Sequence, residues 1–185
     1  MTDSTDHTPL TGLIIGTIAM AVVVTASNVL VRYPINEWLT WGAFSYPVSF
    51  LVNDLTNRRL GLRHARRVVF AGFVCALFLS MVLSTPRIAI ASLTAFLIAQ
   101  LLDVHIFDRL RRAAWWRAPF ISSSVASAVD TLLFFALAFV GTGLPWITWA
   151  IGDYGVKLGM AVFLLLPFRA LLETTRPAGE SIEKA

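Results

Sequence analysis

Charged residues are scarce in this sequence. They make up 14% of its 185 residues, whereas a soluble domain of this size contains about one quarter. Hydrophobic residues reach 57%, and the mean hydropathy is +0.72. This composition excludes an ordinary soluble domain and predicts a membrane protein with little sequence outside its spans.

Cysteine and nucleotide-binding or catalytic motifs are also missing. Cys75 is the only cysteine, so no internal disulfide can form, and the three histidines are too scattered to suggest a metal site. GxxxxGK[ST], HExxH and Gly-x-Gly-Asp do not occur. Because these patterns support ATP hydrolysis or intramembrane proteolysis, we predict that the chain is not an enzyme and needs no cofactor or metal. Residues 1–9 carry no Lys or Arg, so we expect the first span to be retained and not cleaved as a secretory signal.

What the sequence does contain is apolar segments of membrane-spanning length. The second of them is short and includes Pro47. They cover residues 11–31, 38–54, 68–86, 88–107, 119–140 and 146–169. The sequence therefore predicts an all-α bundle of six transmembrane helices over 11–172, flanked by tails at 1–10 and 173–185.

Basic residues are distributed unevenly between the connections. Twelve fall on one side of the predicted membrane and only two, Arg32 and Arg87, on the other. The twelve are Arg58, Arg59, Arg63, Arg66, Arg67, Arg109, Arg111, Arg112, Arg117, Arg169, Arg176 and Lys184. Cytoplasmic connections are enriched in Lys and Arg, so both termini are predicted to be cytoplasmic in a bacterial inner membrane. These charges flank spans, which favours contact with anionic lipid and argues against nucleic-acid binding.

Several polar residues lie at depths where they are costly. Asp130 is near the middle of the fifth span and Lys157 near the middle of the sixth, with Asp153 one turn away from Lys157. A charged side chain at the bilayer centre costs about 2.5–3.5 kcal/mol on insertion scales and normally faces the bundle interior. Asn28, Asp54, Gln100 and Asp103 are further polar residues within or at the end of spans.

Asp153 and Lys157 allow two interpretations. They could form a local i, i+4 ion pair that only stabilises the bundle. Alternatively, Lys157 could be shared between Asp153 and Asp130 at a central site. Three deep carboxylates (Asp103, Asp130 and Asp153) against one lysine leave an excess of acid, which favours a proton site or a site for a ligand with N–H donors or positive charge.

Small residues predict close helix packing. Gly152, Gly155 and Gly159 share one face of the sixth span, next to but distinct from its charged face. Such a face could also support a homodimer. On the fifth span, a stripe at helical spacing contains Ser123, Ser127, Asp130 and Phe134.

Four segments carry a family likeness: "FSYPVSFLVNDLTNRRLG" (44–61), "RIAIASLTAFLIAQLLDVHIFDRLRR" (87–112), "SAVDTLLFFALAF" (127–139) and "GDYGVKLGMAVFLLLP" (152–167). With them, the chain resembles the queuosine-precursor transporters, six-span bacterial inner-membrane proteins grouped with vitamin-uptake transporters. The resemblance implies import of 7-cyano- or 7-aminomethyl-7-deazaguanine, which are used to make the queuosine of transfer RNA.

A guanine-like edge presents adjacent N–H donors, which a carboxylate can accept in a bidentate way, and a flat base can stack on aromatic rings. The predicted substrate-binding residues are Asn28, Phe44, Gln100, Asp130, Thr131, Phe134, Asp153, Tyr154 and Lys157, with Asp54 and Asp103 as proton or gating residues. Three alternatives stay open at this point. The chain could be the substrate-binding subunit of an ATP-driven, multi-component system, a transporter of another nucleobase-like or vitamin-like solute, or a purely structural membrane protein.

Overall fold

Helices account for the fold in the computed structural model, which describes residues 7–30, 33, 35, 39, 41–83 and 85–173. They are α1 (His7–Leu30), α2 (Gly42–Ser45), α3 (Val48–Leu60), α4 (Leu62–Leu83), α5 (Pro86–Leu110), α6 (Arg117–Phe139), α7 (Trp146–Phe163) and α8 (Leu165–Glu173). No strand occurs in these ranges, so the all-α prediction is confirmed. Most of both predicted tails, together with Arg32, Arg176 and Lys184, lies outside the described residues.

Six helical segments correspond to the six predicted spans. Within the described ranges, five regions are long and apolar enough to cross a membrane: Leu10–Leu30, Leu62–Leu83, Pro86–Leu110, Arg117–Phe139 and Trp146–Leu172. The second predicted span differs from these five because it is divided into α2 and α3, and α3 carries several polar residues. The third begins six residues earlier than predicted, because helix α4 continues through the arginine-rich stretch after Gly61.

Prolines explain the two interrupted segments. Pro47 has no N–H to donate to the carbonyl four residues before it, and the chain breaks between α2 and α3 at this point. Pro167 has the same effect on the carbonyl of Phe163, where α7 ends, and α8 then starts at Leu165. By contrast, Pro86 stands in the first turn of α5 behind the N-cap Thr85, where a missing N–H costs nothing.

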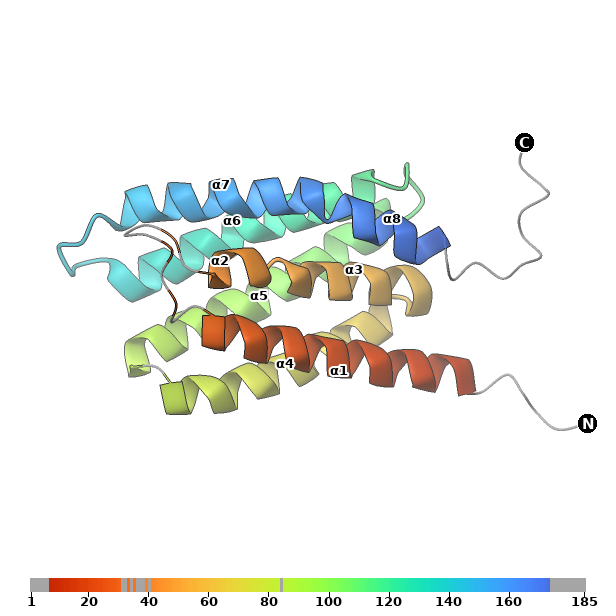
Figure 1. Ribbon diagram of the computed structural model, residues 1–185, viewed down its shortest axis with the longest axis horizontal. Coiled ribbons are helices and arrows are strands. Elements are labelled where there is room, and N and C mark those ends of the chain that lie inside the picture. The colour runs from red at the N-terminus through yellow and green to blue at the C-terminus, as the bar shows by residue number, and fades with distance from the viewer. Residues whose placement is uncertain are drawn as a thin grey trace, which may run out of the picture.

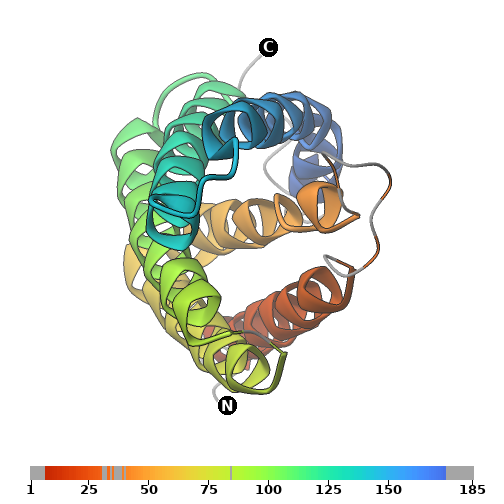
Figure 2. The ribbon, with the colours of Figure 1, turned by 90° about the vertical axis from the view of Figure 1, so that its left-hand side faces the viewer.

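Helix α3 occupies the middle of the bundle. It contacts α1 and α4 on one side and α5, α6 and α8 on the other, and Figure 2 shows it between α1 and the pair formed by α6 and α7. Its polar side chains are therefore buried between helices and do not face lipid. Ser49, Asn53, Asp54 and Asn57 are all at most 2% exposed.

The arginine-rich connections lie at one end of the bundle. The connection from α3 to α4 and that from α5 to α6 are found there, together with the start of α1 and the end of α8 (Figure 1). An even number of crossings places the first and last helix ends on the same side, in agreement with six spans. That this end faces the cytoplasm remains a prediction from the charge distribution.

The glycines of α4 and α7 have opposite surroundings. A Cβ at Gly72 on α4 would lie 2.5 Å from Met20 Cγ, so this glycine permits the close approach of α1 and α4. At Gly152, Gly155 and Gly159, nothing in the described part of the chain lies within 4 Å of such a Cβ. Close packing of this glycine face against another helix is therefore not found within the chain, because α7 directs Asp153 and Lys157 inward; a homodimer through this face stays a prediction.

Candidate functional site

Lys157 on α7 is held between two aspartates and a threonine. Its Nζ lies 2.8 Å from Asp130 Oδ2, 2.5 Å from Asp153 Oδ2 and 3.0 Å from Thr131 Oγ1. Tyr46 completes the group: its hydroxyl donates to Asp130 Oδ1 at 3.1 Å, and its ring lies 5.4 Å from Lys157 Nζ. We call these five residues the lysine cluster. Lys157 is thus shared between Asp130 and Asp153, as the second of the two sequence interpretations predicted.

The proline break positions Tyr46 in this cluster. Tyr46 is the residue between α2 and Pro47, at the depth where the two short helices meet. At this junction the Tyr46 ring packs edge-on against Phe50 of α3 and Phe96 of α5. The phenol then reaches α6 across the bundle.

The lysine cluster lines a cavity of about 360 Å³. This volume falls within the range of about 300–1,000 Å³ that is typical of small-molecule sites. Tyr46, Asp130, Asp153 and Lys157 form its polar part. The remaining lining is mostly apolar or small and comprises Val24, Ser27, Asn28, Leu39, Gly42, Ala43, Ala76, Ile88, Ser92, Ala95, Phe96, Phe134, Phe135 and Phe139.

The cavity lies in the half of the bundle away from the arginine-rich connections. It is lined by the last turns of α1, the first turns of α5 and the second half of α6, which meet at the left-hand end of Figure 1. If the basic end is cytoplasmic, this cavity belongs to the outer half of the protein.

Phenylalanines of α6 form one wall of the cavity. Phe134 and Phe135 lie edge to face with ring centroids 5.2 Å apart, and Phe139 packs edge-on against Trp149 of α7 at 5.6 Å. Aromatic faces and edges beside a polar cluster can hold a flat ring by stacking while the polar groups fix its orientation.

A second buried polar group lies toward the basic end, and we call it the amide cluster. Asn53 Nδ2 donates to Gln100 Oε1 and Asp103 Oδ2, both at 3.1 Å, and Gln100 Nε2 donates to Ser49 Oγ at 2.7 Å. Ser122 and Ser123 of α6 each donate to Asp54 at 3.3 Å. The cluster consists of Ser49, Asn53, Asp54, Asn57, Gln100, Asp103, Ser122 and Ser123.

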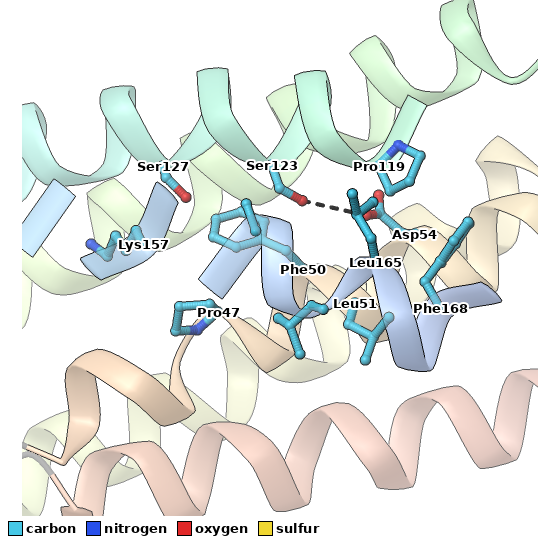
Figure 3. A pocket seen from close by; sticks show the side chains of 12 residues that line it. Pro47, Phe50, Leu51, Asp54, Pro119, Ser123, Ser127, Lys157, Leu165 and Phe168 are labelled. Atoms are coloured by element: carbon cyan, nitrogen blue, oxygen red, sulfur yellow. Dashed lines mark hydrogen bonds between the residues drawn. The ribbon is translucent and has the colours of Figure 1, made fainter. Parts of the chain in front are cut away.

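Between the two clusters lies a very small cavity, shown in Figure 3. Its volume of about 10 Å³ is at the lower limit for one water molecule. Lys157 and Ser127 lie at one end, and Asp54, bonded to Ser123, lies at the other. The stripe predicted on α6 therefore runs from the amide cluster at Ser123 to the main cavity at Asp130 and Phe134.

Comparison with known proteins assigns the chain to a family. The sequence profile of the family described as "Putative vitamin uptake transporter" matches residues 40–85 and 78–172. The "Queuosine precursor transporter" of Escherichia coli (strain K12) is 37% identical over 82% of this chain and 81% of the relative. The "Probable queuosine precursor transporter" of Haemophilus influenzae is 33% identical over 78% of this chain and 79% of the relative. This chain belongs to the queuosine precursor transporter family.

A further relative shares the same printed function. The "Probable queuosine precursor transporter" of Bacillus subtilis (strain 168) is 28% identical over 68% of each chain. No solved structure gives a significant match. As a member of this family, the chain is a multi-pass bacterial membrane transporter, and since its relatives are named as transporters, the prediction that it is not an enzyme is confirmed.

The predicted site residues of this transporter fall into three groups. Asn28, Asp130, Phe134, Asp153 and Lys157 line the main cavity, and Thr131 is bonded to Asp153 and Lys157 beside it. Gln100, Asp54 and Asp103 belong to the amide cluster. Phe44 and Tyr154 line neither cavity, and Phe44 is 36% exposed. For these two residues the geometry gives no support for contact with substrate.

Sequence reasoning missed several residues that the transporter brings into both clusters. Tyr46, Ser49, Asn53 and Asn57 were not singled out, although all four lie in one of the segments that carry the family resemblance. Spacing offered one signal: Ser49, Asn53 and Asn57 recur every four residues and so share one helical face. Of the aromatic residues predicted to stack on the base, Phe134 lines the cavity, and Phe135 and Phe139 extend this wall in place of Phe44 and Tyr154.

Proposed function

We propose that this chain imports 7-deazaguanine precursors of queuosine, with the cavity at the lysine cluster as the substrate site. The observation that carries the proposal is a small-molecule-sized cavity in which two carboxylates, one ammonium and a phenol meet an aromatic wall. The relatives' names supply the solute class, and the cavity chemistry agrees with a flat base that has several N–H donors.

Asp153 is the better placed of the two carboxylates for a ligand. Its side chain is 19% exposed, against 7% for Asp130. Both oxygens of Asp130 are occupied, one by Tyr46 and one by Lys157. At Asp153 the bonds from Thr131 and Lys157 both reach Oδ2, and none of the described residues donates to Oδ1. Asp153 Oδ1 is thus available for an N–H of the base, while Asp130 fixes Lys157 and Tyr46.

The net charge of the lysine cluster favours one of the two bases. Two carboxylates and one ammonium leave one negative charge in a largely apolar cavity. The aminomethyl substituent carries a basic amine, whereas the nitrile is neutral, so we expect the aminomethyl base to bind more tightly.

Purified protein in liposomes tests this function directly. Uptake of labelled 7-cyano- and 7-aminomethyl-7-deazaguanine is measured with no other protein present, beside equilibrium binding in detergent. We expect saturable binding and uptake of both bases, and weak competition by adenine. Binding without uptake would instead support a substrate-binding subunit that requires an ATPase, and no binding of either base would overturn the proposal.

A further inference from the structure

Asp54 and Asp103 form a buried carboxyl pair at the core of the amide cluster. They are 2% and 0% exposed. Their carboxyl groups interact with each other, and Ser122 lies against both. The pair connects α3, α5 and α6 on the side of the lysine cluster that faces the basic end.

No cation compensates this pair among the described residues. Besides Asp103, the groups that act on Asp54 are Ser122 and Ser123 of α6, and those that act on Asp103 are Asn53, Asp54 and Ser122. The small cavity next to Asp54 is also lined by residues of the α7–α8 segment. One of them is Lys157, which is paired with Asp130 and Asp153, and the others are the apolar residues Ala161, Leu164, Leu165 and Phe168.

The charged groups on the remaining neighbouring turns are directed elsewhere. Arg58 donates to the carbonyl of Arg111, and Arg111 pairs with Asp108 at 3.4 Å. On α4, His64 bonds the carbonyl of Leu60 at the end of α3, and Arg66 contacts His105 at the exposed surface. Among the described residues, the hydrogen bonds given to the carboxyl pair come from the neutral donors Asn53, Ser122 and Ser123.

Acceptor atoms outnumber donors in the cluster. Three buried oxygens have no hydrogen-bond partner: Asn53 Oδ1, Asn57 Oδ1 and Asp103 Oδ1. Asn53 is 0% exposed and its amide is directed at Asp103. Buried polar atoms are normally paired, so two unpaired amide oxygens and one unpaired carboxyl oxygen indicate that the site lacks one positively charged or donating species. A proton on the pair supplies that donor and removes the repulsion between like charges.

We propose that Asp54 and Asp103 together bind one proton, whose exchange drives uptake by this transporter. The inference rests on the proposed transport function. In one step, a proton entering from the cavity side forms the O–H bond on the pair. In the next, that bond breaks and the proton passes to water at the basic end, which leaves both groups as carboxylates until the next proton arrives.

Hydrogen bonds connect the carboxyl pair to the substrate site. Asp103 is bonded to Asn53, and Asn53 to Gln100. Gln100 in turn donates to Ser49, whose hydroxyl donates to the carbonyl of Tyr46, and the Tyr46 phenol donates to Asp130 of the lysine cluster. A change in protonation at one end thus alters the bonds that orient Tyr46 at the other, and this gives a physical basis for coupling.

The test compares Asp54→Asn and Asp103→Asn with Asp108→Asn in proteoliposomes. Asp108 is the matched control because it lies on α5 near the same end but is paired with Arg111. Both pair variants are expected to bind the base within about three-fold of wild type and to lose accumulation driven by an inward proton gradient, while exchange of labelled for unlabelled base persists. The Asp108 variant is expected to behave as wild type.

A second measurement does not depend on transport or on the variants folding. Infrared spectroscopy of the wild-type protein in membranes should show a buried protonated carboxyl band that exchanges with deuterium and disappears as the pH is raised. Absence of this band, accumulation that follows a sodium gradient, or full gradient-driven uptake by Asp103→Asn would each overturn the proton site. If wild type binds no deazapurine while the band is present, the proposed substrate fails and the proton site stands.

Discussion

The lysine cluster and the amide cluster each contain two aspartates inside the bundle, but the partners of these carboxyl groups differ. Asp130 and Asp153 share an ammonium group, and each takes a further hydroxyl bond from Tyr46 or Thr131. Asp54 and Asp103 have only hydroxyl and amide partners among the described residues. The first cluster faces a cavity of about 360 Å³, whereas the second is enclosed by packed helices.

This difference separates two tasks that a transporter must combine. A charge-compensated site can stay ionised and wait for a ligand, because the ion pairs already offset much of the desolvation cost. An uncompensated carboxyl pair is stable only when it carries an additional proton, so its state depends on proton supply. Substrate recognition and energy coupling would thus reside in neighbouring but chemically distinct regions.

Removal of the lysine should produce the largest effect. In Lys157→Met, two carboxylates lose their cation, which makes the lysine cluster resemble the amide cluster. Breaking a buried ion pair from one side costs about 3–5 kcal/mol. We expect a clearly lower unfolding temperature in detergent and no uptake.

The double variant Lys157→Met/Asp130→Asn provides the control for this prediction. It removes one of the two carboxylates that have lost their cation, so it should recover part of the lost stability. If the single variant unfolds at the wild-type temperature, the ion pairs contribute little, and the contrast between the clusters loses its energetic basis.

Asp153→Asn should have the next largest effect, and on affinity more than on folding. Hydrogen bonds to charged groups contribute about 1.5–3 kcal/mol, so the dissociation constant for the base should rise by about 10–100-fold. Calorimetric titration of the purified variant measures this change. Asp103→Asn, in the other cluster, serves as the comparison and should change affinity by less than about three-fold; equal losses in the two variants would contradict separate tasks.

Tyr46→Phe tests the link between the clusters with a smaller change. The ring and its packing on Phe50 and Phe96 remain, but the donor to Asp130 is lost. The lost bond orients Asp130 and is not itself made to the base, so the effect should be smaller than at Asp153. We expect about five-fold weaker binding, which corresponds to about 1 kcal/mol, together with less uptake for a given proton gradient. Unchanged uptake at saturating base, with only the affinity altered, would show that Tyr46 serves recognition and not coupling.

Much of this arrangement could be predicted from the sequence. The apolar runs predicted the helices, and the arginines predicted that the basic connections lie at the same end of the bundle. The depth of Asp130 and Lys157 in their spans indicated that the two side chains meet. Partners that depend on chain geometry could not be predicted. Tyr46 enters the lysine cluster from the junction of two short helices, and Asn53 reaches Asp103 because α3 lies at the centre of the bundle. Neither consequence is visible in periodicity alone.

The glycine face of α7 lies on the outer side of the helix that carries Lys157. A substitution there is expected to have the smallest effect on uptake and stability. A methyl group at Gly155 meets no described atom within 4 Å, and alanine is the better helix former by up to about 1 kcal/mol. In a monomer, Gly155→Ala should leave uptake unchanged and keep or slightly raise the unfolding temperature. Gly72→Ala is the matched control and should lower it, because its methyl would lie 2.5 Å from Met20. If Gly155→Ala instead weakens a dimer detected by cross-linking in membranes, the glycine face is a protein interface, and α7 then serves the site with one face and the dimer with the other.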